Sequence, residues 1–296
     1  MLSFVANLMS ADVQPAAWAK AREAEGWPVL GASDHFWSDG RPFPHLWVAL
    51  ATMAAATDGV LLTSSFANNI VRSPVEFAQA ALGMQQVSGG RFEAGLGAGW
   101  SRDEILGAGL AYPDPPERAG RYAEAVQIVR QLFHEGSCRF SGRHYAIDVP
   151  VIGPRQIPPP PIVASVGGSR TIREVTPHVD RVELKANAPA TRGGALDLEV
   201  AGQISKQHLH DLVSAVRRVR EDVPLGLFVL CSVGEDRLTK YMRSKCDPHG
   251  LFADFYGPAE QVAEAVRKLE GYGLDRVQLS PFNDGAFEQL APLLLA

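Results

Sequence analysis

A histidine directly after an aspartate is the pair in this chain best suited to proton chemistry. Asp34 and His35 lie in the segment Ser33-Asp34-His35-Phe36, which follows an apolar stretch at 28–32 that predicts a strand. Imidazole titrates near neutral pH, so His35 is suited to donate or accept a proton during a reaction. The alternative is that His35 only forms a hydrogen bond at the end of the strand.

Two glycine-rich turns are suited to bind a flat or phosphorylated ligand through the backbone. Gly97-Ala98-Gly99 ends the segment 88–100, SGGRFEAGLGAGW, and Gly167-Gly168-Ser169 precedes a short predicted helix. Glycine lets a backbone approach a ligand closely, and the free N–H groups at a helix N-terminus favour phosphate. Tight connections without a ligand are the alternative for both turns, with Ser169 as a helix N-cap.

Strand-like and helix-like segments alternate along nearly the whole chain, which predicts a parallel sheet. Eight such units with right-handed crossovers favour a closed (β/α)8 barrel, a single domain over residues 1–296. An open dinucleotide-binding sheet is the alternative, but no GxGxxG motif follows the first strand. The predicted strands are 4–8, 28–32, 60–65, 92–97, 162–166, 181–184, 225–230 and 277–280.

The carboxyl ends of barrel strands meet on one face, where ligands bind in this fold. The Asp34-His35 pair, the Ser64-Ser65 pair and both glycine-rich turns all follow predicted strands. We therefore expect them to converge on one site.

Composition excludes several functions. A net charge of -5 gives no basic surface for nucleic acid, and no apolar run is long enough to span a membrane. The three cysteines are widely spaced and match no metal-binding or disulfide pattern, which favours a cytoplasmic protein. The strand ends carry no cluster of His and carboxylate ligands, so we expect no metal site.

The chain resembles the bacterial luciferase-like flavin and deazaflavin oxidoreductases over nearly its whole length. The motifs that carry the resemblance are SDHF, TSS with RSP, SGGRFEAGLGAGW, the helix after PPER, PIVASVGGSR and the C-terminal GPAEQVAEAVRKLEGYGLDRVQLSPF. The resemblance implies an α/β fold, a (β/α)8 TIM barrel with loop insertions at the C-terminal face. It also implies a homodimer.

The same resemblance implies roles for individual residues. His35 would lie beside the reactive carbon of the cofactor ring, and Asp34 would contact that ring. Ser64 and Ser65 fall where relatives carry a non-prolyl cis peptide behind the ring, although a sequence does not show a cis bond. The other residues expected to contact the cofactor are Asn68, Gly97, Ala98, Gly99, Gly167, Gly168 and Ser169.

Aromatic residues are expected to line the entrance to the substrate site, which suggests a largely apolar or planar small molecule. They are Phe36, Trp37, Trp100, Tyr112, Phe252 and Phe255. Some relatives that oxidise sugar phosphates carry Glu where Trp100 stands, so that substrate class is disfavoured.

The resemblance implies hydride transfer between coenzyme F420 and a small substrate, with His35 as proton donor or acceptor. A second hypothesis keeps the fold but uses reduced FMN and oxygen as a monooxygenase. A third is a flavin-binding protein without catalysis. The Asp34-His35 pair favours the deazaflavin, without excluding FMN.

Overall fold

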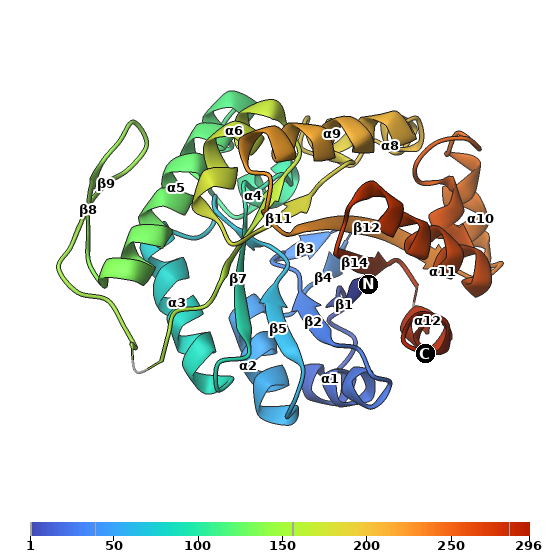
Figure 1. Ribbon diagram of the computed structural model, residues 1–296, viewed down its shortest axis with the longest axis horizontal. Helices are drawn as coiled ribbons and strands as arrows, with labels where there is room; N and C mark the ends of the chain where they lie inside the picture. Colours follow the sequence, from blue (N-terminus) through green and yellow to red (C-terminus); the bar gives the residue numbers. More distant parts are fainter. Residues whose placement is uncertain (1, 39, 156, 284) are drawn as a thin grey trace.

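Eight parallel strands form a closed barrel in the computed structural model, which describes residues 2–38, 40–155, 157–283 and 285–296. Strand β1 pairs with β2 and β14, and β7 pairs with β10, so the ring closes (Figure 1). This confirms the predicted (β/α)8 barrel. In ring order the strands are β1 (Ser3–Leu8), β2 (Val29–Ala32), β5 (Leu61–Ser64), β7 (Phe92–Gly97), β10 (Ile162–Val166), β11 (Arg181–Leu184), β12 (Leu225–Val233) and β14 (Arg276–Pro281).

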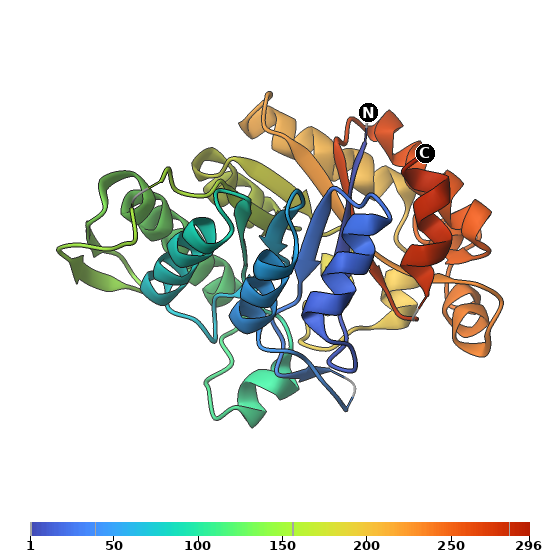
Figure 2. The same cartoon turned by 90° about the horizontal axis from the view of Figure 1, so that it is seen from below.

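Helices surround the barrel, and both chain termini lie on the same side of the molecule (Figures 1 and 2). The longer helices are α1 (Pro15–Ala24), α2 (Leu46–Ala56), α3 (Pro74–Val87), α5 (Pro115–Glu135), α9 (Lys206–Val219), α11 (Ala259–Lys268) and α12 (Ala286–Leu294). Shorter ones are α4 (Arg102–Gly107), α6 (Ser169–Val175), α7 (Ala188–Thr191), α8 (Leu198–Gly202), α10 (Arg237–Ser244) and the 3-10 turns η1 (Thr176–His178), η2 (Ala253–Phe255) and η3 (Leu269–Tyr272).

Local sequence explains where helices α3 and α5 begin. Ser73 caps α3 by accepting a hydrogen bond from the Glu76 N–H, and Asp114 caps α5 by accepting one from the Glu117 N–H. Proline occupies the first turn of each helix, where its missing N–H costs nothing. Helix α5 ends at Gly136, whose φ of 74° is a left-handed conformation that glycine adopts readily.

Short strands extend from the barrel as insertions. Strands β3 (Trp37–Ser38) and β4 (Arg41–Pro42) pair after β2, and β8 (Cys138–Ser141) and β9 (Ala146–Val149) form a hairpin that projects beyond α5 (Figure 1). Strand β6 (Ala67–Asn68) pairs with β7, and β13 (Tyr256–Gly257) pairs with β12.

The barrel interior holds paired polar side chains as well as apolar ones. Glu93 on β7 forms an ion pair with Arg276 on β14. The Asn7 side-chain amide donates to the hydroxyls of Ser33 and Ser280, 3.0 Å from each. These partners come from both ends of the chain, so the interior joins strands that are distant in sequence.

Several predicted loops contain regular structure. The expected loop 98–116 includes α4, where Ser101-x-x-Glu104 precedes apolar Ile105, a pattern typical of a helix start. The stretch 136–161, expected only to leave and rejoin the barrel, forms the β8–β9 hairpin, and the irregular stretch 235–254 contains α10.

Among the residues that the structure describes, no helix is long and apolar enough to cross a membrane. All three cysteines are free thiols.

Candidate functional site

The structure places the predicted site residues at the carboxyl ends of neighbouring strands, as a parallel barrel requires. Asp34 and His35 follow β2, and Ser64 ends β5. Gly97 ends β7, and the Gly167-Gly168 turn follows β10, the next strand around the ring. These groups therefore share one rim of the barrel.

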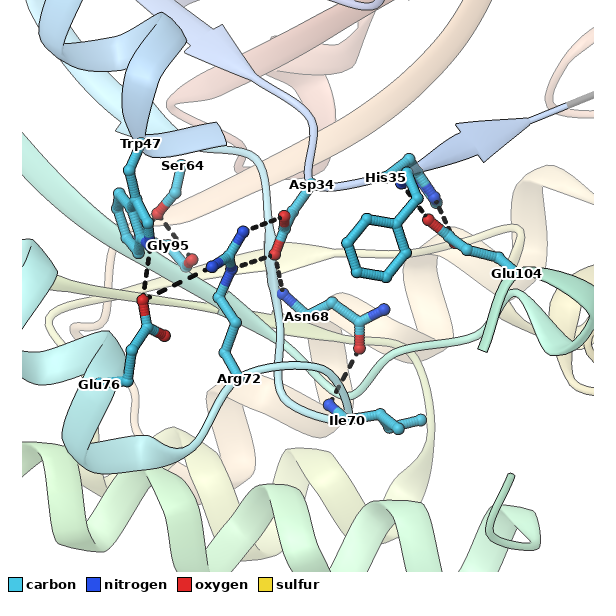
Figure 3. Close-up of polar contacts among 11 residues, drawn as sticks. Asp34, His35, Trp47, Ser64, Asn68, Ile70, Arg72, Glu76, Gly95 and Glu104 are labelled. Carbon is cyan, nitrogen blue, oxygen red and sulfur yellow. Dashed lines mark hydrogen bonds and ion pairs between the residues drawn. The ribbon is translucent and has the colours of Figure 1, made fainter. Parts of the chain in front are cut away.

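Asp34 is held by a two-pronged ion pair with Arg72. Its Oδ2 accepts from the Arg72 Nε at 2.7 Å and its Oδ1 from Nη2 at 2.8 Å (Figure 3). Oδ2 also accepts from the Asn68 N–H at 2.8 Å. Burial alone would lower the pKa of the Arg72 guanidinium, but the bonds and charge of Asp34 and Glu76 raise it above its usual range. Asp34 thus fixes the loop that carries Asn68 and Arg72.

The loop after β6 lies against the first glycine-rich turn. The Asn68 Oδ1 accepts from the Ile70 N–H at 3.0 Å. A Cβ at Gly99 would lie 2.3 Å from that Asn68 oxygen, and Gly99 has φ of 79°. Glycine is required here because both the space and the backbone conformation exclude a side chain.

His35 is oriented by a buried carboxylate from α4. The Glu104 Oε2 lies 2.8 Å from the His35 Nδ1, and the Glu104 Oε1 accepts from the Phe36 N–H (Figure 3). The Glu104 side chain is only 2% exposed, whereas that of His35 is 18% exposed. An ionised carboxylate accepts hydrogen bonds, so Nδ1 carries a proton and Nε2 is left to exchange one with a ligand.

Aromatic rings surround His35. The Trp100 and Phe43 rings meet it edge-on, with centroids 5.8 and 5.2 Å from that of the imidazole. Phe36 and Trp37 are 44% and 38% exposed. Together with Trp100 these groups form an aromatic rim beside the His35 imidazole.

Three expected members of that rim lie differently. The Tyr112 hydroxyl donates to the Trp100 carbonyl at 2.9 Å, which supports the rim from behind. Phe252 and Phe255 are 6% and 2% exposed, and their rings pack together 6.1 Å apart. Turn η2 contacts α11 and β12, so these two rings fill the packing there and do not form an open wall.

Ser64 and Ser65 direct their hydroxyls into the protein. The Ser64 Oγ donates to the Gly95 carbonyl and accepts from the Gly95 N–H, both at 2.8 Å, and the Ser65 hydroxyl accepts from Gln278. The cis peptide joins Ser65 to Phe66, one residue beyond the Ser64–Ser65 position considered from the sequence. At this point the backbone and Phe66 can contact a ligand, whereas the serine hydroxyls are already hydrogen-bonded within the protein.

Unpartnered side-chain donors lie close to the first glycine-rich turn. The Asn69 N–H donates to the Gly97 carbonyl, while the Asn69 Nδ2 is buried without a partner among the described residues. The Tyr145 hydroxyl lies 3.4 Å from the Asn69 Oδ1, and the Arg121 guanidinium lies 5.3 Å from the Tyr145 ring. The Arg121 Nε is also buried and unpartnered in the described part of the chain. This cluster could bind a phosphate next to Gly97.

The second glycine-rich turn starts helix α6, for which Ser169 was considered as the N-cap residue. Gly168, not Ser169, is the N-cap residue, and Thr171 accepts from the Gly168 N–H at 3.4 Å. Ser169 is the first residue of the helix and is exposed. Its side chain and the first N–H groups of α6 are accordingly free to contact a ligand.

Lys185 directly follows β11, is partly buried, and was missed by sequence reasoning. Its Nζ lies 3.1 Å from the Phe228 ring centroid and 5.4 Å from that of Phe66. Burial lowers the pKa of Lys185 to about 7, although the charge of Glu183 opposes the shift. In the sequence, only its position directly after a predicted strand could have drawn attention to Lys185.

Glu104 and Arg121 were also missed, for different reasons. Glu104 lies in a segment expected to be a loop, yet the Ser101-x-x-Glu104 spacing signals a helix start. In the structure the Glu104 carboxylate forms its hydrogen bonds with the His35 ring and the Phe36 N–H, and not with the backbone at the start of α4. Arg121 falls on the helix predicted after PPER, where only the contact with the Tyr145 ring shows how its side chain lies.

Two hollows lie outside the strand-end cluster. A small apolar one of about 20 Å³ is lined by residues that include Phe252, Leu230 and Met242. A larger one of about 360 Å³ lies between α5, α6 and the β8–β9 hairpin. The residues that the structure describes contain no group of three or more side chains able to hold a metal ion.

Comparison with known proteins gives one family match. Residues 14–239 match the family model described as luciferase-like monooxygenase.

Curated relatives share about half of the chain. The F420-dependent glucose-6-phosphate dehydrogenase of Kineococcus radiotolerans is 32% identical over 158 residues, 52% of this chain and 46% of that protein. The F420-dependent hydroxymycolic acid dehydrogenase of Mycobacterium tuberculosis is 30% identical over 161 residues, 52% of this chain and 44% of that protein. The chain thus spans about half the length of the curated relatives it matches.

Solved structures match over nearly the whole chain. An F420-dependent secondary alcohol dehydrogenase in complex with an F420-acetone adduct superimposes with a TM-score of 0.74 at 16% identity, covering 99% of both chains. The monooxygenase RslO1 from Streptomyces bottropensis gives 0.74 at 17% identity, covering 99% of this chain and 97% of that one. These likenesses show the shared barrel.

Proposed function

Because the chain belongs to the luciferase-like monooxygenase family, we propose that it is an oxidoreductase that transfers a hydride between coenzyme F420 and a small organic molecule. The observation that carries the proposal is the His35–Glu104 pair at the strand ends. The relatives of K. radiotolerans and M. tuberculosis, both F420-dependent dehydrogenases, support the choice of cofactor.

The residues present fit such a cofactor. Gly99 packs directly against Asn68, where a Cβ would collide, so the turn holds the loop that carries Asn68 in place at the strand ends. The unpartnered Asn69 Nδ2 and Arg121 Nε, with the first N–H groups of α6, would hold its phosphate. The deazaflavin ring carries a carbon where flavin has N5, and it supplies hydride chemistry with little reactivity toward oxygen.

His35 exchanges the proton that accompanies the hydride. Glu104 holds the imidazole with its Nδ1 protonated, which directs proton exchange to Nε2. When Nε2 takes up a proton, the buried Glu104 carboxylate balances the positive charge that forms on the ring. Asp34, whose carboxylate is occupied by Arg72, positions the loop around the ring.

The substrate is a largely apolar or planar alcohol, carbonyl, enone or imine. Phe36, Trp37 and Trp100 give the rim aromatic surfaces that favour such molecules. A tryptophan at position 100 disfavours a sugar phosphate, although the K. radiotolerans relative is named for glucose-6-phosphate.

A monooxygenase that uses reduced FMN is the second candidate. The family description and the fold match with RslO1 favour it. It differs from the first in its requirement for oxygen. The third hypothesis, a flavin-binding protein without catalysis, requires that His35 have no effect on any turnover.

Parallel binding titrations with F420 and FMN, each oxidised and reduced, test the proposal. We expect F420 to bind with micromolar or lower Kd and FMN to bind negligibly. His35→Gln should retain F420 binding and lose hydride transfer to a panel of enones, imines and alcohols, while His249→Gln, an exposed histidine, should behave as wild type. Preferential binding of reduced FMN with oxygen consumption would replace the proposal by the monooxygenase.

A further inference from the structure

Helix α4 carries the Glu104 carboxylate but has few anchors of its own. Of its six residues, all of which the structure describes, only Glu104 and Ile105 are buried. In the described part of the chain, the N-cap residue Ser101 forms no side-chain hydrogen bond with the helix. A helix this short is not stable in isolation, because its first turn is costly to form. Contacts from other elements therefore hold α4 in the place from which Glu104 reaches His35 (Figure 3).

The start of α4 is held by a segment that follows strand β11. We call residues 188–197, which contain α7, the α7 segment. Within it, the Gly194 carbonyl accepts from the N–H of Arg102, the first residue of α4, at 2.8 Å. That N–H is one of the donors that a helix leaves without an intrahelical partner. The α7 segment thus supplies an acceptor that the Ser101 side chain does not.

Gly194 fits closely against α4 because it has no side chain. It is buried, and its φ of 98° is a left-handed conformation that favours glycine. A Cβ here would lie 2.5 Å from the Arg102 Cβ and 2.7 Å from the Tyr112 hydroxyl oxygen. Tyr112 in turn donates to the Trp100 carbonyl at 2.9 Å. A side chain at this position would therefore push the α7 segment away from α4 and from the residue that supports the aromatic rim.

The α7 segment is itself anchored on the second glycine-rich turn and on α5. A Cβ at Gly167 would lie 2.4 Å from that of Ala188, so the first residue of α7 packs directly on the turn. Farther along, the Arg192 carbonyl accepts from the buried Arg118 of α5 at 3.1 Å. The segment therefore connects the turn proposed to bind phosphate with the helix that holds His35.

We propose that Gly194 is a positioning residue for proton transfer, which it serves by keeping α4 where Glu104 holds the His35 ring. The inference rests on the proposed function, in which His35 exchanges the proton that accompanies the hydride. Gly194 acts through α4 and Glu104. When its contact with α4 is lost, the Glu104 carboxylate moves away from the His35 Nδ1, and the ring becomes free to adopt the other tautomer.

Gly194→Ala and Gly193→Ala are a matched pair of variants that test this inference. Gly193 is exposed, and a Cβ there meets no described atom within 4 Å. In single-turnover measurements, Gly194→Ala should lower the rate of hydride transfer about 10-fold, the loss expected for one hydrogen bond to a charged group. The Kd for F420 should be unchanged. Gly193→Ala should match wild type in both quantities, and thermal melting checks the fold of each variant.

A second background separates positioning from a merely structural role. In Glu104→Gln the carboxylate that Gly194 positions is already absent, so adding Gly194→Ala should change the rate by less than about 2-fold, whereas independent effects would multiply. If Gly194→Ala does not fold, Arg118→Lys loosens the same segment, because it loses the bond to the Arg192 carbonyl. Its effect on the rate should likewise disappear in the Glu104→Gln background.

Nuclear magnetic resonance of isotope-labelled histidine gives a readout that needs no cofactor. The ring nitrogen shifts of His35, assigned by comparison with His35→Gln, report which nitrogen carries the proton. We expect Nδ1 to carry it in wild type and Gly193→Ala, and a mixture of tautomers in Gly194→Ala.

A folded Gly194→Ala variant with the wild-type spectrum and rate would overturn the inference and leave the proposed function standing. If wild type transfers no hydride to or from F420, the proposed function fails. The spectra then decide alone whether Gly194 positions the ring, and an unchanged His35 signal overturns the inference as well.

Discussion

Replacing Glu104 by glutamine should slow hydride transfer without weakening cofactor binding. The carboxylate now accepts two hydrogen bonds, from the His35 Nδ1–H and from the Phe36 N–H. A glutamine amide has one acceptor oxygen and one donor NH₂ group. Either the His35 ring changes its tautomer, which protonates Nε2, or a donor faces another donor.

The magnitude follows from the charge that the substitution removes. Hydrogen bonds to a charged group contribute about 1.5 to 3 kcal/mol. A neutral glutamine does not balance the positive charge that forms on the His35 ring, so the loss of the carboxylate falls on the proton-transfer step. At about 1.4 kcal/mol per factor of ten, the rate should fall about 10- to 150-fold.

Single-turnover absorbance measurements with bound F420 and the best substrate of the panel give this rate. Titration gives the Kd for F420, which should be unchanged, and thermal melting checks the fold. The matched control is Asp103→Asn, the exposed acid next to Glu104 on α4, which should keep the wild-type rate. A folded Glu104→Gln variant with the full rate would refute this role for the carboxylate.

Three further substitutions test the surroundings of the site. Arg72→Lys cannot form the two-pronged bond to Asp34 and should lower the free energy of unfolding by about 2 kcal/mol, measured in urea; an unchanged midpoint would contradict this. Gly99→Ala places a Cβ 2.3 Å from the Asn68 oxygen at φ of 79°, so the Kd for F420 should rise at least several-fold, and an unchanged Kd would show that the turn lies away from the cofactor. Burial raises the pKa of Glu183 from 4.5 to about 7, against the opposing charges of nearby basic residues. The stability that the protonated carboxyl contributes is fully present below pH 4.5 and is lost as pH rises through 7, a fall of about 3 kcal/mol. Glu183→Gln should remove this fall from the free energy of unfolding measured against pH, and a variant with the pH profile of wild type would contradict it.

The barrel was predictable because hydrophobic alternation and helix punctuation act locally. Pro74 in the first turn of α3 and Gly136 after α5, for example, need only neighbouring residues to take effect. The approach of Asp34, His35 and the glycine-rich turns was predictable too, since a parallel barrel gathers all strand ends on one rim.

The partners of those residues were not predictable from the sequence. Glu104 lies 69 residues from His35, and its pairing depends on how α4 folds back over β2. The inward direction of the Ser65 hydroxyl, and the burial of Phe255 in packing against α11, likewise depend on contacts between distant elements. Residue type indicated chemistry here, but tertiary packing decided which groups are free to perform it.

The hydrogen bonds inside the barrel affect the order in which the chain can fold during synthesis. Asn7 on the first strand donates to Ser280 on the last, and Ser65 at the end of the third accepts from Gln278. Chains leave the ribosome from the N-terminus, at about 5 to 20 residues per second. The segment that bears His35 therefore emerges many seconds before β14. The barrel rim around His35 is complete only when β14 has joined β1 and closed the ring.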